Sequence, residues 1–143
     1  MSSIDAIIQD ALRTRYAIVI DDNFTNYQEA CDYIATLPKD SILIFAWHRH
    51  KDLRLQSAAY ENGLIIEDLT AQDDGLIQMF ELAHDANDFK YTREFLLLVN
   101  MDAMILWYDR KPKNTKSLRR DALKMGIPII ENPTLPKQLS LFD

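Results

Sequence analysis

The chain has 143 residues and a formal net charge of −6, and 48% of its residues are apolar. That length and apolar content are enough for one domain with a substantial core, and the acidic balance argues against general coating of nucleic acid. The sequence has no run of about 18 apolar residues and no N-terminal basic segment followed by an apolar one, so we expect neither membrane insertion nor secretion. The single cysteine, Cys31, fits a reducing cytoplasm.

Five segments of the sequence have the character of β-strands. Four are apolar runs, at Tyr16–Ile20, Ser41–Trp47, Leu64–Glu67 and Ala103–Tyr108. Their apolar residues are continuous rather than alternating, which is typical of parallel strands covered on both faces. The fifth, Ile127–Ile130, is short and contains Pro128, so we expect it at an edge of the sheet.

Helical spacing of apolar residues fills the stretches between these strands. Asn26, with Glu29 three residues on, predicts the start of one helix, and Pro38 lies beyond its end. Gly63 and Gly126 are placed to end two others. The apolar spacing predicts helices over residues 4–12, 27–37, 55–62, 76–83, 89–99 and 115–125.

Strands that alternate with helices predict an α/β fold, which we expect to be a Rossmann-like three-layer fold with about five mostly parallel strands. Residues 1–131 would form one domain. The stretch 70–90 is longer than a plain connection and predicts an added helix. Residues 132–143 would form a flexible C-terminal tail after a short proline-containing linker.

Polar residues follow the first and fourth predicted strands, where an open α/β sheet places its ligands. Asp21 and Asp22 could orient a ribose, hold Mg²⁺ or act as acid and base; the alternative is a capping and solubilising role. After the fourth strand, the start of a helix surrounded by cations predicts a seat for a phosphate or carboxylate. Its residues are Lys113, Asn114, Thr115 and Lys116.

Glycine and histidine positions limit the cofactors that the chain could hold. Only Gly63, Gly75 and Gly126 are present, so neither a P-loop nor a Gly-x-Gly-x-x-Gly turn can be written, and we expect no cofactor. We do not expect His48 and His50 to share a metal ion.

Several short segments resemble the SLOG superfamily of Rossmann-like nucleotide-ligand proteins, which includes cytokinin-activating phosphoribohydrolases. Thr92-Arg93-Glu94 resembles the family's arginine-containing helix, residues 102–106 its hydrophobic strand, Asn114-Thr115 the start of its phosphate-facing helix, and residues 124–128 its closing turn. The resemblance implies a nucleotide-like ligand, with Arg93, Thr115 and Lys116 on phosphate. Where the family has a glycine-rich turn, residues 47–51 are bulky, so the glycine motifs are degenerate and we favour a non-catalytic domain.

The final residues resemble the peptide with which bacterial polymerases and repair proteins dock on the β sliding clamp. That peptide has the form Gln-Leu-x-Leu-Phe, and every fixed position is present: Gln138, Leu139, Leu141 and Phe142. The resemblance implies an accessory or modulatory protein of DNA replication or repair. An apolar tail that packs on its own domain or on another subunit is the alternative.

The segment that precedes the fifth strand is strongly basic. Residues 109–124 hold seven Lys or Arg against two Asp, which gives +5 in this segment and −11 in the rest of the chain. Arg110–Lys124 could therefore contact DNA or a replisome protein, or could be a solvated helix face.

Overall fold

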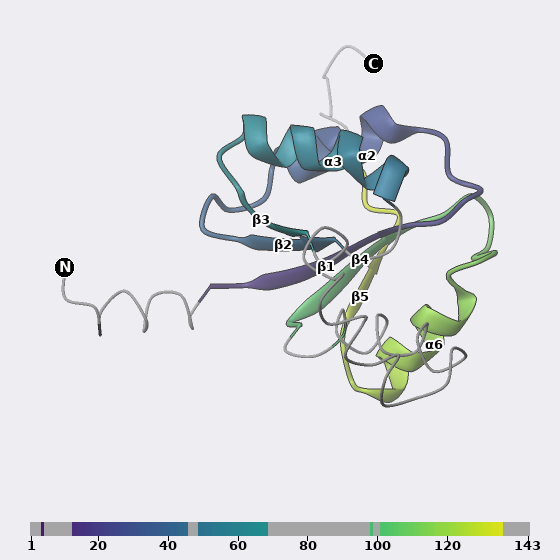
Figure 1. Ribbon diagram of the computed structural model, residues 1–143. Coiled ribbons are helices and arrows are strands. Elements are labelled where there is room, and N and C mark those ends of the chain that lie inside the picture. The colour runs from purple at the N-terminus through teal and green to yellow at the C-terminus, as the bar shows by residue number, and fades with distance from the viewer. Residues whose placement is uncertain (1–3, 5–12, 46–48, 69–97, 99–100, 136–143) are drawn as a thin grey trace, which may run out of the picture.

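The computed structural model describes residues 4, 13–45, 49–68, 98 and 101–135 (Figure 1). Within them the chain forms one five-stranded sheet and three helices. Most of the helix predicted at 4–12, and the helices predicted at 76–83 and 89–99, lie outside the described residues, as does the added helix expected within 70–90.

All five strands are parallel and lie in the order β3-β2-β1-β4-β5. They are β1 Arg15–Ile20, β2 Ile42–Phe45, β3 Ile65–Asp68, β4 Ala103–Trp107 and β5 Ile129–Glu131. The α/β Rossmann-like fold expected from the sequence is confirmed, as is the edge position of the fifth strand. The strand order reverses at β1 and β4, which pair side by side and therefore create a switch point at their carboxyl ends.

Helices cover both faces of the sheet and make a three-layer molecule (Figure 1). On one face, α2 (Tyr27–Ile34) and α3 (Arg49–Glu61) bury Ala30, Ile34 and Leu55 against side chains of β1, β2 and β4. On the other face, α6 (Lys116–Lys124) buries Leu118 and Ala122 in a second apolar cluster. Alternate residues of β1 enter opposite clusters, which explains why the strand is apolar throughout.

Local sequence explains where the helices begin and end. The Asn26 side chain accepts from the Glu29 backbone N–H at 3.3 Å and donates to the Glu29 carboxylate at 3.1 Å, so α2 begins as predicted. Gly63 and Gly126 follow α3 and α6 with φ of 72° and 75°, a backbone conformation that glycine adopts without steric cost.

Two predicted boundaries are wrong. The helix predicted to begin at residue 55 already includes Arg49, so His50 lies in α3 and not on a continuing strand. The predicted end of the second strand, Trp47, lies outside the described residues. The first described helix ends at Ile34 rather than Leu37, although Leu37 is still buried. Among the described residues, no helix has the length and apolar character needed to cross a membrane.

Candidate functional site

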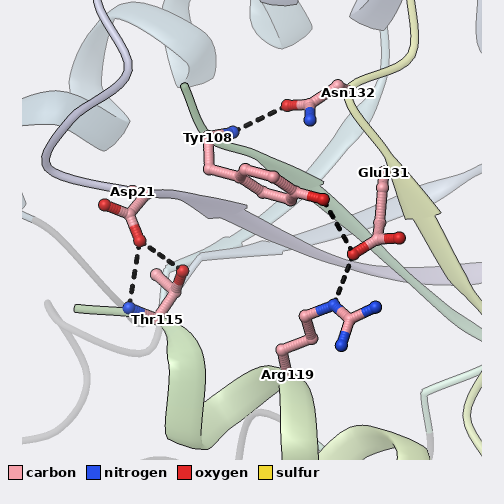
Figure 2. A network of polar contacts seen from close by, with 6 residues as sticks. All are labelled: Asp21, Tyr108, Thr115, Arg119, Glu131 and Asn132. Atoms are coloured by element: carbon pink, nitrogen blue, oxygen red, sulfur yellow. Dashed lines mark hydrogen bonds and ion pairs between the residues drawn. The ribbon is translucent and has the colours of Figure 1, made fainter. Parts of the chain in front are cut away.

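Two loops meet at the switch point, one after β1 and one between β4 and α6. Asp21 lies at the end of β1 and is completely buried. Its Oδ2 accepts hydrogen bonds from the Thr115 hydroxyl at 2.5 Å and the Thr115 backbone N–H at 3.1 Å (Figure 2). It also accepts from the Lys113 backbone N–H at 2.9 Å. Its Oδ1 accepts from the backbone N–H of Asn23 at 3.1 Å. Both oxygens of this carboxylate are thus used inside the protein.

The hydrogen bonds decide the charge state of Asp21. Burial alone would raise its pKa, but the Thr115 hydroxyl and the three backbone N–H groups together outweigh burial and hold the pKa below its ordinary value. The group is therefore an anion at neutral pH. It sits at the start of α6, where backbone N–H groups and the helix dipole favour negative charge.

At the predicted phosphate site, residues 113–116, the structure places the Asp21 carboxylate. Thr115 is the N-cap residue of α6, and the backbone N–H groups of Lys113 and Thr115 donate to Asp21. A side chain of the same molecule occupies the position that an external phosphate would take at those groups. The described contacts of Asp21 are thus structural ones, with the loop before α6 and with the N-cap residue Thr115.

Asn23 holds the first part of the β4–α6 loop. Its side-chain amide donates to the carbonyl oxygens of Asp109 at 3.0 Å and Lys111 at 2.9 Å, and its Oδ1 accepts from the Asp109 backbone N–H at 2.9 Å. The Lys111 N–H also donates to the Asp109 carbonyl at 2.8 Å across Arg110, whose φ is 68°. This is a tight three-residue turn in a strained conformation, and Asn23 fixes it.

The remaining predicted ligand residues lie at the same edge of the sheet. The Asp22 backbone N–H donates to Asn114 Oδ1 at 2.9 Å, so these two residues meet. Lys113 and Lys116 carry exposed side chains on the loop and on the first turn of α6. Arg93, expected on phosphate, lies outside the described residues, as do the tail residues 138–142.

A second polar network ties β5 to β4 and α6. The Glu131 carboxylate accepts from the Tyr108 hydroxyl at 3.1 Å and pairs with Arg119 through a short hydrogen bond (Figure 2). The bond from Arg119 lowers the pKa of Glu131, and burial together with Glu131 raises the pKa of the Tyr108 phenol. Asn132 Oδ1 accepts from the Tyr108 backbone N–H at 2.7 Å, so the chain after β5 stays joined to β4.

A pocket of about 340 Å³ opens beside the switch point, between the start of α2 and the segment that follows β5. Its walls include Phe24, Asn26, Glu29, Asp109 and Thr134. This volume lies in the range typical of small-ligand sites. None of the predicted ligand residues lines it, and its charged walls are carboxylates rather than cations, so the lining does not suit a phosphate.

Sequence reasoning noticed the polar stretch after the first strand but did not assign a role to Asn23. It also missed Tyr108 and Asn132, and it treated the residues after Glu131 as a linker. One sequence signal for a turn was available at this place, because Asn132 directly follows a strand and asparagine tolerates positive φ. Its φ in the structure is 47°. The contacts within the fold extend to Pro133, whose carbonyl accepts from Trp107 Nε1 at 3.2 Å.

In the part of the chain that the structure describes, no group of three or more His, Cys, Asp or Glu side chains could hold a metal ion. Comparison of the chain with protein-family models, with curated proteins and with solved structures gives no match.

Proposed function

We propose that this protein docks on the bacterial β sliding clamp through Gln138, Leu139, Leu141 and Phe142, and acts as an accessory or modulatory protein of DNA replication or repair. The observation that carries the proposal is the pentapeptide itself, in which every fixed position of the clamp-binding pattern is filled. Aliphatic and aromatic anchors at alternate or adjacent positions, with one polar residue for orientation, are what an extended peptide needs in a preformed groove.

The path of the preceding residues supports this proposal. Asn132 and Pro133 are held against β4, and the two residues that follow, Thr134 and Leu135, are exposed. The chain is therefore at the surface three residues before Gln138. A peptide that begins near a fixed surface point can reach a partner without disturbing the sheet.

In the proposed mechanism, Leu139, Leu141 and Phe142 fill the clamp groove while Gln138 hydrogen-bonds at its rim. A single short peptide of this kind binds with a Kd on the order of micromolar. The α/β domain is then what the peptide carries to the clamp. Such docking would either recruit this domain to the clamp or displace other clamp-binding proteins. Neither effect requires catalysis by the domain.

The test is binding of the intact protein to purified β clamp by calorimetry or surface plasmon resonance. We expect a Leu141→Ala/Phe142→Ala variant to lose about 100-fold or more in affinity, because truncated buried anchors each cost on the order of 2 kcal/mol. Leu135→Ala is the matched control, since Leu135 is an exposed leucine just before the peptide, and it should change the affinity less than twofold. Equal binding by the double variant, or no binding by the intact protein, would refute the proposal.

The pocket beside the switch point favours a second candidate function, a SLOG-like sensor of a nucleotide derivative or a phosphoribohydrolase-type enzyme. Its volume and position suit a small ligand, while its carboxylates favour a nucleoside or amine over a phosphate. A ligand that binds only the native state stabilises it by RT ln(1 + [L]/Kd), so the melting temperature rises with ligand concentration. Thermal shifts with nucleosides and nucleotides, compared between the intact protein and Asn26→Ala, would identify this function; shifts that are equal in both place the ligand elsewhere.

A further inference from the structure

We propose that the outward side of α6 and the loop before it bind the phosphate backbone of duplex DNA. We call this surface the basic face and define it by six residues: Arg110, Lys111, Lys113, Lys116, Arg120 and Lys124. The inference rests on the proposed function, because docking on a clamp that encircles DNA is what would bring the duplex within reach.

Charge and exposure single out this surface. All six side chains are exposed, in a segment of +5 on a chain whose remaining residues sum to −11. Arg119, which is the seventh cation of the segment, is half-buried and pairs with Glu131, so it serves the fold instead. Arg120 has only a long contact of 3.7 Å with Asp121 and remains 62% exposed. Because the rest of the chain is acidic and repels phosphates, we expect the protein to bind DNA only through the basic face.

The geometry of α6 arranges three of these cations in a row. Leu118 and Ala122 point into the core, which fixes the rotation of the helix. Lys116, Arg120 and Lys124 recur every four residues and therefore share the side turned away from the sheet. With a rise of about 1.5 Å per residue, they span about 12 Å. Cations spread along a line suit a linear polyanion better than a single small anion.

The loop adds cations that the fold holds in place. Asn23 fixes the strained turn at Arg110, and the buried Asp21 carboxylate fixes the backbone of Lys113. The side chains of Arg110, Lys111 and Lys113 thus project from a backbone that is hydrogen-bonded to Asp21 and Asn23, in the loop after β1. A fixed backbone lowers the ordering cost when the side chains meet phosphates.

Asp21 also determines how an anion can be bound here. Its carboxylate takes the backbone N–H groups of Lys113 and Thr115, which lie directly before α6. The exposed cationic side chains of the basic face are therefore the groups that we expect to contact a phosphate backbone. Side-chain contacts to a phosphate backbone are independent of base sequence and sensitive to salt. We therefore expect sequence-independent binding that becomes appreciable when the clamp raises the local DNA concentration.

The experiment measures binding of the intact protein to a fluorescent duplex of about 30 base pairs, alone and with the clamp loaded on it, over a range of salt concentrations. Lys116→Glu and Lys124→Glu should each weaken binding about fivefold at low salt and reduce the salt slope by about one. Lys39→Glu is the matched control, because Lys39 is an exposed lysine in the connection between α2 and β2 and the change in charge is the same. It should weaken binding less than twofold.

Three outcomes would overturn the inference. The first is no binding of the wild-type protein to either form of DNA, and the second is an equal loss in Lys39→Glu. The third is a loss of affinity for the clamp without DNA in Lys116→Glu, which would assign the basic face to an acidic protein surface. Failure of the proposed function can be distinguished from these outcomes. If the protein does not bind the clamp but Lys116→Glu still weakens DNA binding, the docking peptide is refuted and the inference about the basic face stands.

Discussion

The Asp21 carboxylate is a buried charge whose hydrogen bonds all come from within the protein. Three of its four partners belong to the loop and helix that follow β4, and Thr115 is 94 residues away along the chain. A buried carboxylate that accepts several hydrogen bonds stabilises the geometry around it, because loss of any partner leaves an unsatisfied charge. Asp21 therefore helps to fix the start of α6 relative to β1, together with the apolar contacts of Leu118 and Ala122.

Thr115→Val should destabilise the protein by about 2 kcal/mol, because it removes the hydroxyl that donates to Asp21 while keeping the shape of the side chain. Thr115→Ser keeps the hydroxyl and loses one buried methyl group, which costs about 0.8 kcal/mol. Urea unfolding followed by circular dichroism gives both values. A valine variant as stable as the serine variant would contradict this role for the hydroxyl.

The lowered pKa of Asp21 gives its contribution to stability a definite pH dependence. Since the pKa is lower in the folded protein than in the unfolded chain, the contribution is fully present above the ordinary Asp value of about 3.9 and is lost as pH falls through the folded value. The difference in unfolding free energy between wild type and Asp21→Asn should thus be constant from about pH 5 to 7 and shrink below about pH 4.

Urea titrations at each pH measure this difference. Asp40→Asn controls for the loss of a negative charge, because Asp40 is exposed, and it should change the unfolding free energy by less than about 0.5 kcal/mol at pH 7. A wild-type advantage over Asp21→Asn that grows as the solution becomes more acidic would show that the sign is wrong.

Helix ends are the elements whose sequence signals were strongest. Asn26 and Gly126 are used as predicted, because caps act through bonds or backbone angles within a few residues. Thr115 is the N-cap residue of α6 by position, but its hydroxyl donates to Asp21 instead of capping the helix. The start of α3 was placed six residues late, because the helical spacing of apolar residues begins only at Leu55 while the helix begins at Arg49. The contacts of Asp21 and Asn23 could not be predicted, since they cross from β1 to a loop more than 80 residues away, and spacing along the chain carries no signal for them.

Gly126→Ala tests the end of α6. An added methyl group would meet no atom within 4 Å, so the cost arises from the positive φ of 75° alone. We expect a loss of about 1 kcal/mol in unfolding free energy. Gly126→Asn should lose less, because asparagine tolerates this conformation better. Thermal and urea unfolding compare the three proteins, and an alanine variant equal to wild type would mean that the turn relaxes.

At the scale of the whole molecule, the proposed docking peptide should be separable from the fold. Removal of residues 136–143 leaves the Trp107–Pro133 hydrogen bond and the β4–β5 contacts in place. The truncated protein should therefore match the wild-type unfolding free energy within about 0.5 kcal/mol and lose clamp binding. The full-length Leu141→Ala/Phe142→Ala variant serves as the control. A loss of 2 kcal/mol or more on truncation would instead favour a tail that packs on its own domain.

The central position of β1 has a consequence for synthesis of the chain. One edge of β1 pairs with β2, which follows soon after it, but the other edge pairs with β4, where Tyr16 meets Ala103. At roughly 5 to 20 residues per second, the ribosome takes roughly 4 to 17 seconds to supply that partner. During this interval the growing chain has β1, whose last four residues are buried in the finished sheet, without a neighbour on one side. The nascent protein is thus most exposed to misassociation before β4 emerges, whatever the stability of the finished sheet.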